Sequence, residues 1–157
     1  MAGICAEHIN PLLIAARQIL QTACQIDAVI GKPTLEGITG KTDTFAISIN
    51  LIGDIKGQAL LAFDCSVACD IASRMCMIPI TEMDDLSKSA ICELGNMIMG
   101  NAATVFSTHG ISVDITPPLL IQGDVLFSKT YGSYICIPII YDGDKVVELH
   151  FAARGND

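Results

Sequence analysis

Glu93 and Asn96 are the two residues whose types and spacing most directly suggest chemistry in this sequence. They lie in a run from Asp84 to Gly110 that predicts one long helix, and side chains three positions apart on a helix project from the same face. A carboxylate beside a carboxamide suits a protein that positions a water molecule or grips a partner. We therefore take this stretch as the candidate functional site.

The predicted long helix has a polar face and a separate apolar stripe. At about 100° per residue, Ser89, Glu93, Asn96 and Gly100 fall within an arc of about 60°. The apolar residues, which centre on another side, are Leu86, Ile91, Leu94, Met97, Ile98, Ala102 and Val105. The helix should therefore bury one side and present the other to solvent.

Two glycines inside this helix, Gly95 and Gly100, need a physical reason. Each costs about 1 kcal/mol relative to alanine in a helix interior, and glycine permits another backbone to approach closely. One of the two could admit the sheet or a neighbouring helix. Gly100 lies on the polar face and could admit an external partner.

The elements before the long helix are a helix, a hairpin and a second helix. Apolar residues at helical spacing predict a helix over 10–24, with Asn10 as its N-cap and proline at the first helical position. A short strand is predicted over 34–39. Alternation over 45–51, a turn at 53–57 and a returning arm over 58–63 predict a hairpin. Ser66 is the predicted cap of a helix over 67–77.

An acidic link and a run of strands complete the pattern. Glu82, Asp84 and Asp85 form the link and are interpreted as capping or solvating residues. Gly110 should end the long helix as its C′ residue, and two prolines at 117 and 118 force an extended segment. Strands are predicted over 119–122, 125–129, 134–141 and 146–153, with a hairpin turn at Asp142-Gly143-Asp144.

This element order predicts the fold class. Hairpins dominate, so we expect an α+β fold whose largely antiparallel sheet carries the long active-site helix and the other helices against it. At 157 residues the chain is expected to be one domain, spanning 1–157. A chain of this length can bury a substantial core.

Composition excludes several classes of function. The apolar fraction is 51%, charged residues make up 17%, and the net charge is −8. This acidic balance disfavours nucleic acid and anionic membrane as partners, since both require a basic surface. No apolar run reaches the roughly 18 residues that span a bilayer, and the N-terminal residues lack the positive region of a signal peptide. A cytoplasmic location is expected.

The cysteines and histidines suggest less. Seven cysteines without a C-x-x-C pair predict reduced thiols rather than a disulfide framework. Cys65, Cys69 and Cys76 could share one side of a helix, but their spacing does not match the common zinc patterns. His8, His109 and His150 share no evident geometry in the sequence.

A second E-x-x-N spacing occurs near the N-terminus, at Glu7 and Asn10. It repeats the spacing of Glu93 and Asn96 in front of the first predicted helix. A capping role already explains Asn10, because proline follows it directly. Whether this pair is a vestigial second site stays open.

The residues of the long helix resemble a known signature. The segment from Ser89 to Met97, S-A-I-C-E-L-G-N-M, followed by V-D-I-T-P-P at 113–118, is similar to the pattern of the CheC/CheX/FliY family of bacterial chemotaxis phosphatases. That pattern is a Ser or Asp, then E-x-x-N, then a proline just over twenty residues on, here Pro117. The resemblance covers essentially the whole chain. The single motif and the length resemble the CheX type more than the CheC type, which has two active sites.

The resemblance implies a specific activity. Proteins of this family hydrolyse the phosphoaspartate of CheY-type receiver domains. Asn96 would orient a water in line with the phosphoryl group, and Glu93 would pair with the lysine that receivers carry beside their aspartate. The receiver supplies Mg²⁺, so this chain is expected to need no metal or cofactor of its own. A homodimer is also implied.

Contacts to the receiver are expected from the same face of the helix. Ser89, Gly100 and Asn101 are the candidate partner-binding residues. The motif proline is interpreted as structural, setting the path of the chain from the helix to the sheet. The output would be chemotaxis or a related two-component signal.

Two other classes of function stay open on the sequence. One is a catalytically silent adaptor that binds a receiver or a flagellar-motor component without dephosphorylating it. The other is a thiol-based enzyme or small-molecule sensor that uses Cys65, Cys69 and Cys76. Replacing these cysteines would separate the thiol hypothesis from the phosphatase, which does not need them.

Overall fold

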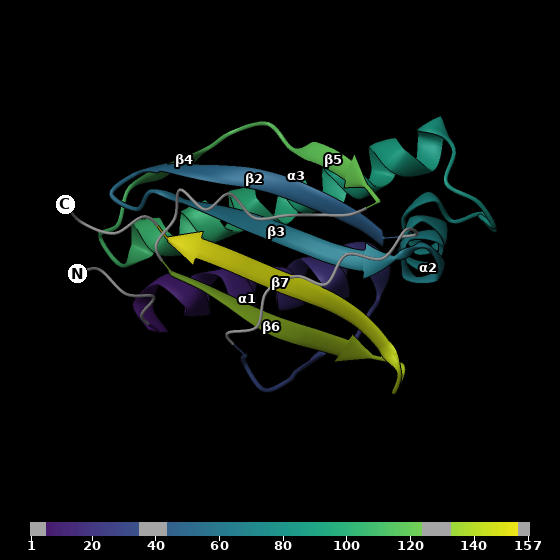
Figure 1. The fold of residues 1–157 in the computed structure, drawn as a ribbon, viewed down its shortest axis with the longest axis horizontal. Helices are drawn as coiled ribbons and strands as arrows, with labels where there is room; N and C mark the ends of the chain where they lie inside the picture. The colour runs from purple at the N-terminus through teal and green to yellow at the C-terminus, as the bar shows by residue number, and fades with distance from the viewer. Residues whose placement is uncertain (1–5, 35–43, 124–132, 154–157) are drawn as a thin grey trace.

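Three helices pack against one antiparallel sheet (Figure 1). The computed structural model describes residues 6–34, 44–123 and 133–153. The helices are α1 (Ala6–Cys24), α2 (Cys65–Cys76) and α3 (Asp85–Thr108). The strands are β1 (Val29–Ile30), β2 (Thr44–Gly53), β3 (Gly57–Asp64), β4 (Val113–Ile115), β5 (Leu119–Gln122), β6 (Ser133–Tyr141) and β7 (Lys145–Ala153). The predicted α+β class with a largely antiparallel sheet is confirmed.

The sheet has the order β1-β6-β7-β3-β2-β4, and β5 also pairs with β2. The β2–β3 and β6–β7 hairpins supply its centre, because β3 pairs with β7. In Figure 1, α1 and α3 lie side by side behind the sheet and α2 lies at one end. Among the described residues, no helix combines the length and apolar character needed to cross a membrane.

Each strand of the hairpins contributes alternate residues to a core beneath the helices. On β2 these are Phe45, Ile47, Ile49 and Leu51, all at most 2% exposed. The opposite face of the sheet has a smaller buried cluster of Ala46, Leu60 and Ala62. The predicted hairpin over 45–63 is confirmed, and its central strands are buried on both faces.

The first helix begins earlier than predicted. Asn10 is not an N-cap: α1 starts at Ala6, and Pro11 lies inside it. The prediction followed the rule that proline favours the first helical turn. Ile9 and Leu12 are both buried in the core, so packing extends the helix upstream even though Pro11 cannot donate a backbone hydrogen bond.

The second helix also has a different cap. Asp64, not Ser66, is the N-cap of α2, and its Oδ1 accepts a hydrogen bond from the Val67 backbone N–H at 2.9 Å. The Ser66 hydroxyl donates to the same carboxylate at 2.8 Å. Since Asp64 ends β3, the chain passes from strand to helix with no intervening loop.

The long helix has the predicted limits. Asp84 caps α3 by accepting from the Ser87 N–H, and the Ser87 hydroxyl accepts from the Asp84 N–H. At the other end Gly110 has a positive φ of 76°. The N–H groups of Gly110 and Ile111 donate to the carbonyls of Ser107 and Phe106, the pattern of a glycine C-cap. Both ends are therefore fixed by local hydrogen bonds.

The capping box makes stability depend on pH. Hydrogen bonds from Ser87 hold the pKa of Asp84 below its usual 3.8. A carboxyl whose pKa is lower in the folded state stabilises the fold above its unfolded pKa and loses that contribution as pH falls through the folded value. We expect Ser87→Ala to unfold more easily than wild type at about pH 7, and the difference to shrink below about pH 3.8. Urea titrations across this range measure the effect, and a difference that grew in acid would contradict it.

The later strands follow the prediction with additions. Strands over 119–122, 134–141 and 146–153 are confirmed as β5, β6 and β7, and the turn at 142–144 joins the last two. The short β1 and β4 were not predicted. Residues 125–129 lie outside the described residues, as does most of 34–39, of which Thr34 forms an isolated bridge with Cys136.

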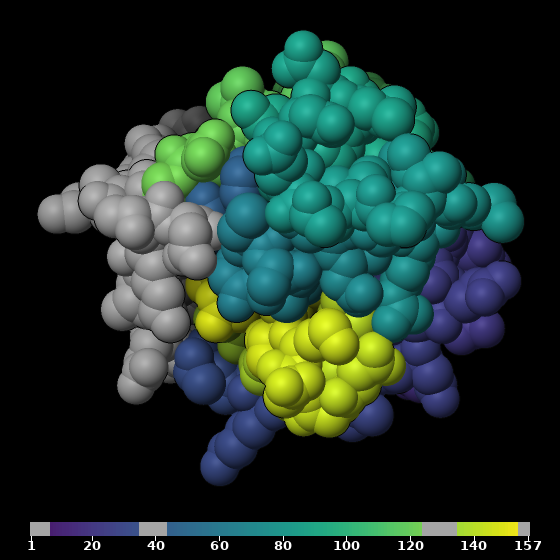
Figure 2. Space-filling view, turned by 90° about the vertical axis from the view of Figure 1, so that its right-hand side faces the viewer, coloured from purple at the N-terminus to yellow at the C-terminus, as the bar shows by residue number. Residues whose placement is uncertain are grey.

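One end of the molecule is joined by a polar network. Figure 2 shows the β6–β7 turn, in yellow, directly against the helices, in teal. The buried Tyr141 hydroxyl donates to Asp70 on α2 at 2.7 Å, and Arg74 bridges Asp70 and Asp142 at 3.1 and 2.9 Å. Burial and the Asp70 carboxylate raise the pKa of Tyr141, so the phenol stays protonated and donates. This network connects α2 to the last hairpin.

Candidate functional site

The polar face of α3 is exposed where the sequence predicted it. Ser89, Glu93 and Asn96 are exposed, and Gly100 is half-buried on the same side. The helix buries its other side, including Ile91, Leu94 and Ile98, at most 1% exposed. Glu93 and Asn96 therefore stand one helical turn apart on the solvent side of a helix fixed by its core contacts.

These side chains form one wall of a groove. The groove has a volume of about 480 Å³ and is lined by Ser89, Cys92, Glu93, Asn96, Ile115, Thr116, Pro117 and Pro118. The second wall is the extended segment that follows β4. Thr116 fastens that segment to β2, because its N–H donates to the Asn50 carbonyl at 3.0 Å and its hydroxyl accepts from the Asn50 N–H at 2.9 Å. Both walls are thus held by the central sheet.

The side chains of Glu93 and Asn96 have no polar partner in the described part of the chain. In the described part of the chain, neither side chain forms a hydrogen bond or an ion pair. A carboxylate accepts hydrogen bonds and pairs with a cation, whereas a carboxamide both donates and accepts. The groove therefore presents one anionic and one neutral group to whatever enters it.

Gly95 sets the distance between this helix and the sheet. A Cβ at Gly95 would lie 2.7 Å from Cγ2 of Ile47 on β2, whereas one at Gly100 would meet nothing within 4 Å. The sheet thus occupies the space beside Gly95, as the sequence allowed for one of the two glycines. The space beside Gly100 is open.

The two glycines provide a matched pair of substitutions. Gly95→Ala should lower the free energy of unfolding, because overpacking costs about 1–3 kcal/mol against a gain of about 1 kcal/mol in helix propensity. Gly100→Ala should raise it by about 1 kcal/mol, since only the propensity changes. Urea denaturation of both variants measures the contrast. Equal stability of the two would contradict the close approach of α3 to β2.

Asn101 differs from the other predicted partner-binding residues. It is half-buried, and its Nδ2 donates to Oε1 of Gln18 on α1 at 2.8 Å. It does not line the groove. Its amide therefore joins the two long helices rather than standing free beside Glu93 and Asn96.

The sequence analysis did not predict that Cys92 and Pro117 line the groove. Cys92 lines the groove because it precedes Glu93 on the helix, and burial raises its pKa, so the thiol is neutral. Pro117 was interpreted as structural only, but it forms part of the facing wall. Its fixed spacing from E-x-x-N was the signal that the two segments meet.

The N-terminal pair lies away from this groove. Glu7 and Asn10 are exposed on α1 and line a separate hollow of about 310 Å³ with Pro11, His109 and Ile111. No residue is shared between the two hollows. The E-x-x-N spacing at this end thus has its own surroundings.

Cys69 on α2 does not have the properties of a reactive thiol. The cysteines in the described part of the chain are free. Burial, with a smaller contribution from Cys65, raises the pKa of Cys69 to about 11. A thiol with this pKa is protonated at neutral pH and is a poor nucleophile. Cys69 therefore gives no support to a thiol-based site on α2.

The fold defines the broad class of this protein. It matches a CheC-like superfamily protein from Shewanella sp. PV-4 with a TM-score of 0.84 at 22% identity, covering 97% of this chain and 100% of that one. A chain of the CheX–CheY–BeF3–Mg²⁺ complex from Borrelia burgdorferi matches with a TM-score of 0.78 at 28% identity, covering 94% of this chain and 98% of that one. The architecture is that of CheC-like chemotaxis proteins.

Sequence comparison narrows the class to a family. Residues 45–140 match the model of the family described as chemotaxis phosphatase CheX. The CheY-P phosphatase CheX of Thermotoga maritima is 28% identical over 150 residues, which cover 95% of this chain and 97% of that protein. The chain therefore belongs to the CheX family of chemotaxis phosphatases.

Proposed function

We propose that this chain is a phosphatase that hydrolyses the phosphoaspartate of a CheY-type receiver domain. The observation that carries the proposal is the pair of exposed side chains, Glu93 and Asn96, that line an open groove on a rigid helix. Membership of the CheX family and the similarity to a chain of a CheX–CheY complex support the same substrate class. The pair would enter the active site of the receiver rather than enclose a substrate within this chain.

Asn96 is assigned to positioning the attacking water. An acyl phosphate is already reactive, and phosphoryl transfer depends chiefly on positioning and on stabilising charge. A carboxamide can accept a hydrogen bond from the water while it donates to a phosphoryl oxygen. Being neutral, it adds no negative charge beside the phosphoryl group, as an aspartate would.

Glu93 is assigned to pairing with the lysine of the receiver. One turn from Asn96, its carboxylate would fix the orientation in which the amide enters the receiver. Ser89 lies one turn further along the same face, and the open space at Gly100 admits partner backbone. We assign Ser89 and Gly100 to receiver contact, and we assign Asn101 a supporting part through its bond to Gln18.

The remaining parts of the proposal concern the setting. The Borrelia burgdorferi complex contains Mg²⁺ together with CheY, and we propose that the receiver supplies that ion during hydrolysis. The groove itself offers a single carboxylate, Glu93, as a hard oxygen ligand. We also propose that the chain is a single catalytic domain that acts in the cytoplasm as a homodimer, without nucleic acid or membrane as a partner.

The direct test mixes the purified chain with a phosphorylated CheY-type receiver and follows phosphate release. The proposal expects faster decay of the phosphoreceiver in proportion to the amount of chain added. Phosphorylation-dependent binding with no change in decay would instead identify the chain as a silent adaptor. An Asn96→Ala bait used on lysate of the native cell would identify which receiver is bound.

A further inference from the structure

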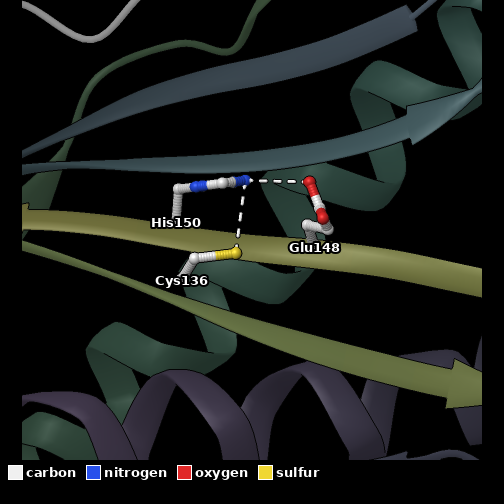
Figure 3. A group of neighbouring side chains, drawn as sticks. All are labelled: Cys136, Glu148 and His150. Atoms are coloured by element: carbon white, nitrogen blue, oxygen red, sulfur yellow. Dashed lines mark hydrogen bonds and ion pairs between the residues drawn. The ribbon is translucent and has the colours of Figure 1, made fainter. Parts of the chain in front are cut away.

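A second group of side chains that could bind a metal ion lies on the face of the sheet away from the helices. Figure 3 shows Cys136, Glu148 and His150 pointing toward one another. Cys136 on β6 pairs directly with His150 on β7, and Glu148 precedes His150 by two residues, on the same face of the strand. Strand register thus brings together three residues that the sequence left unrelated.

The separations of the three ligand atoms suit one small cation. Nε2 of His150 lies 3.6 Å from Sγ of Cys136 and 3.2 Å from Oε1 of Glu148, and all three atoms lie within 4.8 Å of one another. In a tetrahedral zinc site, with Zn–S of about 2.3 Å and Zn–N or Zn–O of about 2.0 Å, ligand atoms stand about 3.3–3.6 Å apart. Two of the separations already fall near this range.

The geometry does not fit a nucleophilic cysteine triad. In such a triad the nucleophile and the orienting carboxylate use opposite nitrogens of the imidazole. Here both Cys136 and Glu148 approach Nε2 of His150. That nitrogen carries either one proton or one lone pair, so it cannot form a full hydrogen bond with both groups at once. A metal ion at the centre contacts all three atoms.

We propose that Cys136, Glu148 and His150 form a zinc site that joins β6 to β7. Thiolate, imidazole and carboxylate are the ligand types that zinc takes in proteins. His150 is 1% exposed, while the Glu148 side chain is 47% exposed, so an ion enters past the carboxylate and is held by the buried pair. Binding displaces the thiol proton to solvent.

This site is separate from the phosphatase groove. Its residues alternate with Ile137 and Leu149, which belong to the core under the helices, so the two sites lie on opposite faces of the sheet. The ion is therefore not part of the hydrolysis assigned to Asn96, and its expected effect is on the stability of the fold. The sequence predicted no metal of the chain's own, so this site is an addition to that prediction.

The test uses Co²⁺ as a spectroscopic substitute for Zn²⁺. The full chain is first treated with a chelator to remove bound metal and is reduced with a reductant that contains no thiol. We expect one equivalent of Co²⁺ to give a thiolate-to-metal charge-transfer band, and Zn²⁺ to displace it. Cys136→Ser should abolish the band, and Glu148→Gln should weaken binding by more than about 10-fold. Cys76→Ser, a thiol at the end of α2, should bind as wild type does. Zn²⁺ should raise the Tm of wild type but not of Cys136→Ser.

Several outcomes would overturn the site. They are the absence of a band in wild type, a band retained in Cys136→Ser, or equal affinity in Glu148→Gln and wild type. Because the Glu148 side chain is half exposed, Glu148→Gln should keep its circular dichroism spectrum and its phosphatase activity. That variant keeps the test decisive even if a substitution of the buried Cys136 perturbs folding.

Discussion

Asn96→Ala should reduce the rate at which the chain dephosphorylates the receiver by about 10²–10³-fold, the usual loss when a positioning group is removed. Asn96 is exposed on α3 and forms no hydrogen bond or ion pair with its side chain among the described residues, so the substitution removes no such bond there. The amide is needed only when water and phosphoryl group are aligned. We therefore expect kcat to fall while the KM for the phosphoreceiver changes little. Phosphate release under saturating and subsaturating receiver measures the two constants.

A matched control comes from α1. Thr22 is exposed and outside the groove, and its hydroxyl donates to the Gln18 carbonyl at 3.0 Å. Thr22→Ala should keep wild-type kcat and KM. Equal rates for Asn96→Ala and wild type would remove Asn96 from the mechanism, even if the chain proved to be a phosphatase.

Sequence patterns predicted the elements better than their limits. Period-2 alternation identified β2, the turn at 53–57 identified β3 as its returning arm, and Asp84 and Gly110 bounded α3, because these signals lie in neighbouring residues. The predicted start of α1 was wrong, because burial of Ile9 in the core outweighed the local preference of proline for the first turn of a helix. The two-residue β1 and three-residue β4 are strands only through pairing with β6 and β2. Such short elements have no pattern of their own.

The site was predictable to the extent that it lies on one helix. Helical geometry places Ser89, Glu93 and Asn96 on one face from the sequence alone. The opposite wall of the groove, at 115–118, depends on how the chain returns along β2. The Cys136–His150 pair depends on the register of the β6–β7 hairpin, which the turn at 142–144 sets. Sites formed by residues from two or more helices or strands therefore became visible only in the structure.

Reversing the charge of Glu93 should act on binding rather than on the chemical step. In the proposed complex, Glu93→Lys would set two like charges against each other, and such juxtaposition costs several kcal/mol, or about 10²–10³-fold or more in affinity. The substitution should be well tolerated by the fold, because Glu93 is exposed and makes no ion pair among the described residues. Glu93→Gln, which loses the charge without reversing it, should lose less affinity. Titration of a receiver stabilised with BeF3 and Mg²⁺ measures all three affinities.

The necessary control separates local charge from net charge. Asp144→Lys changes the chain by the same two charges at an exposed position in the β6–β7 turn. With a net charge of −8, the chain should show only a small, salt-sensitive change in affinity from that substitution. If Glu93→Lys and Asp144→Lys weakened binding equally, long-range charge alone would explain the effect, and the assigned lysine contact would be wrong. A loss confined to Glu93→Lys, with kcat falling instead in Asn96→Ala, would assign binding to the carboxylate and water positioning to the amide.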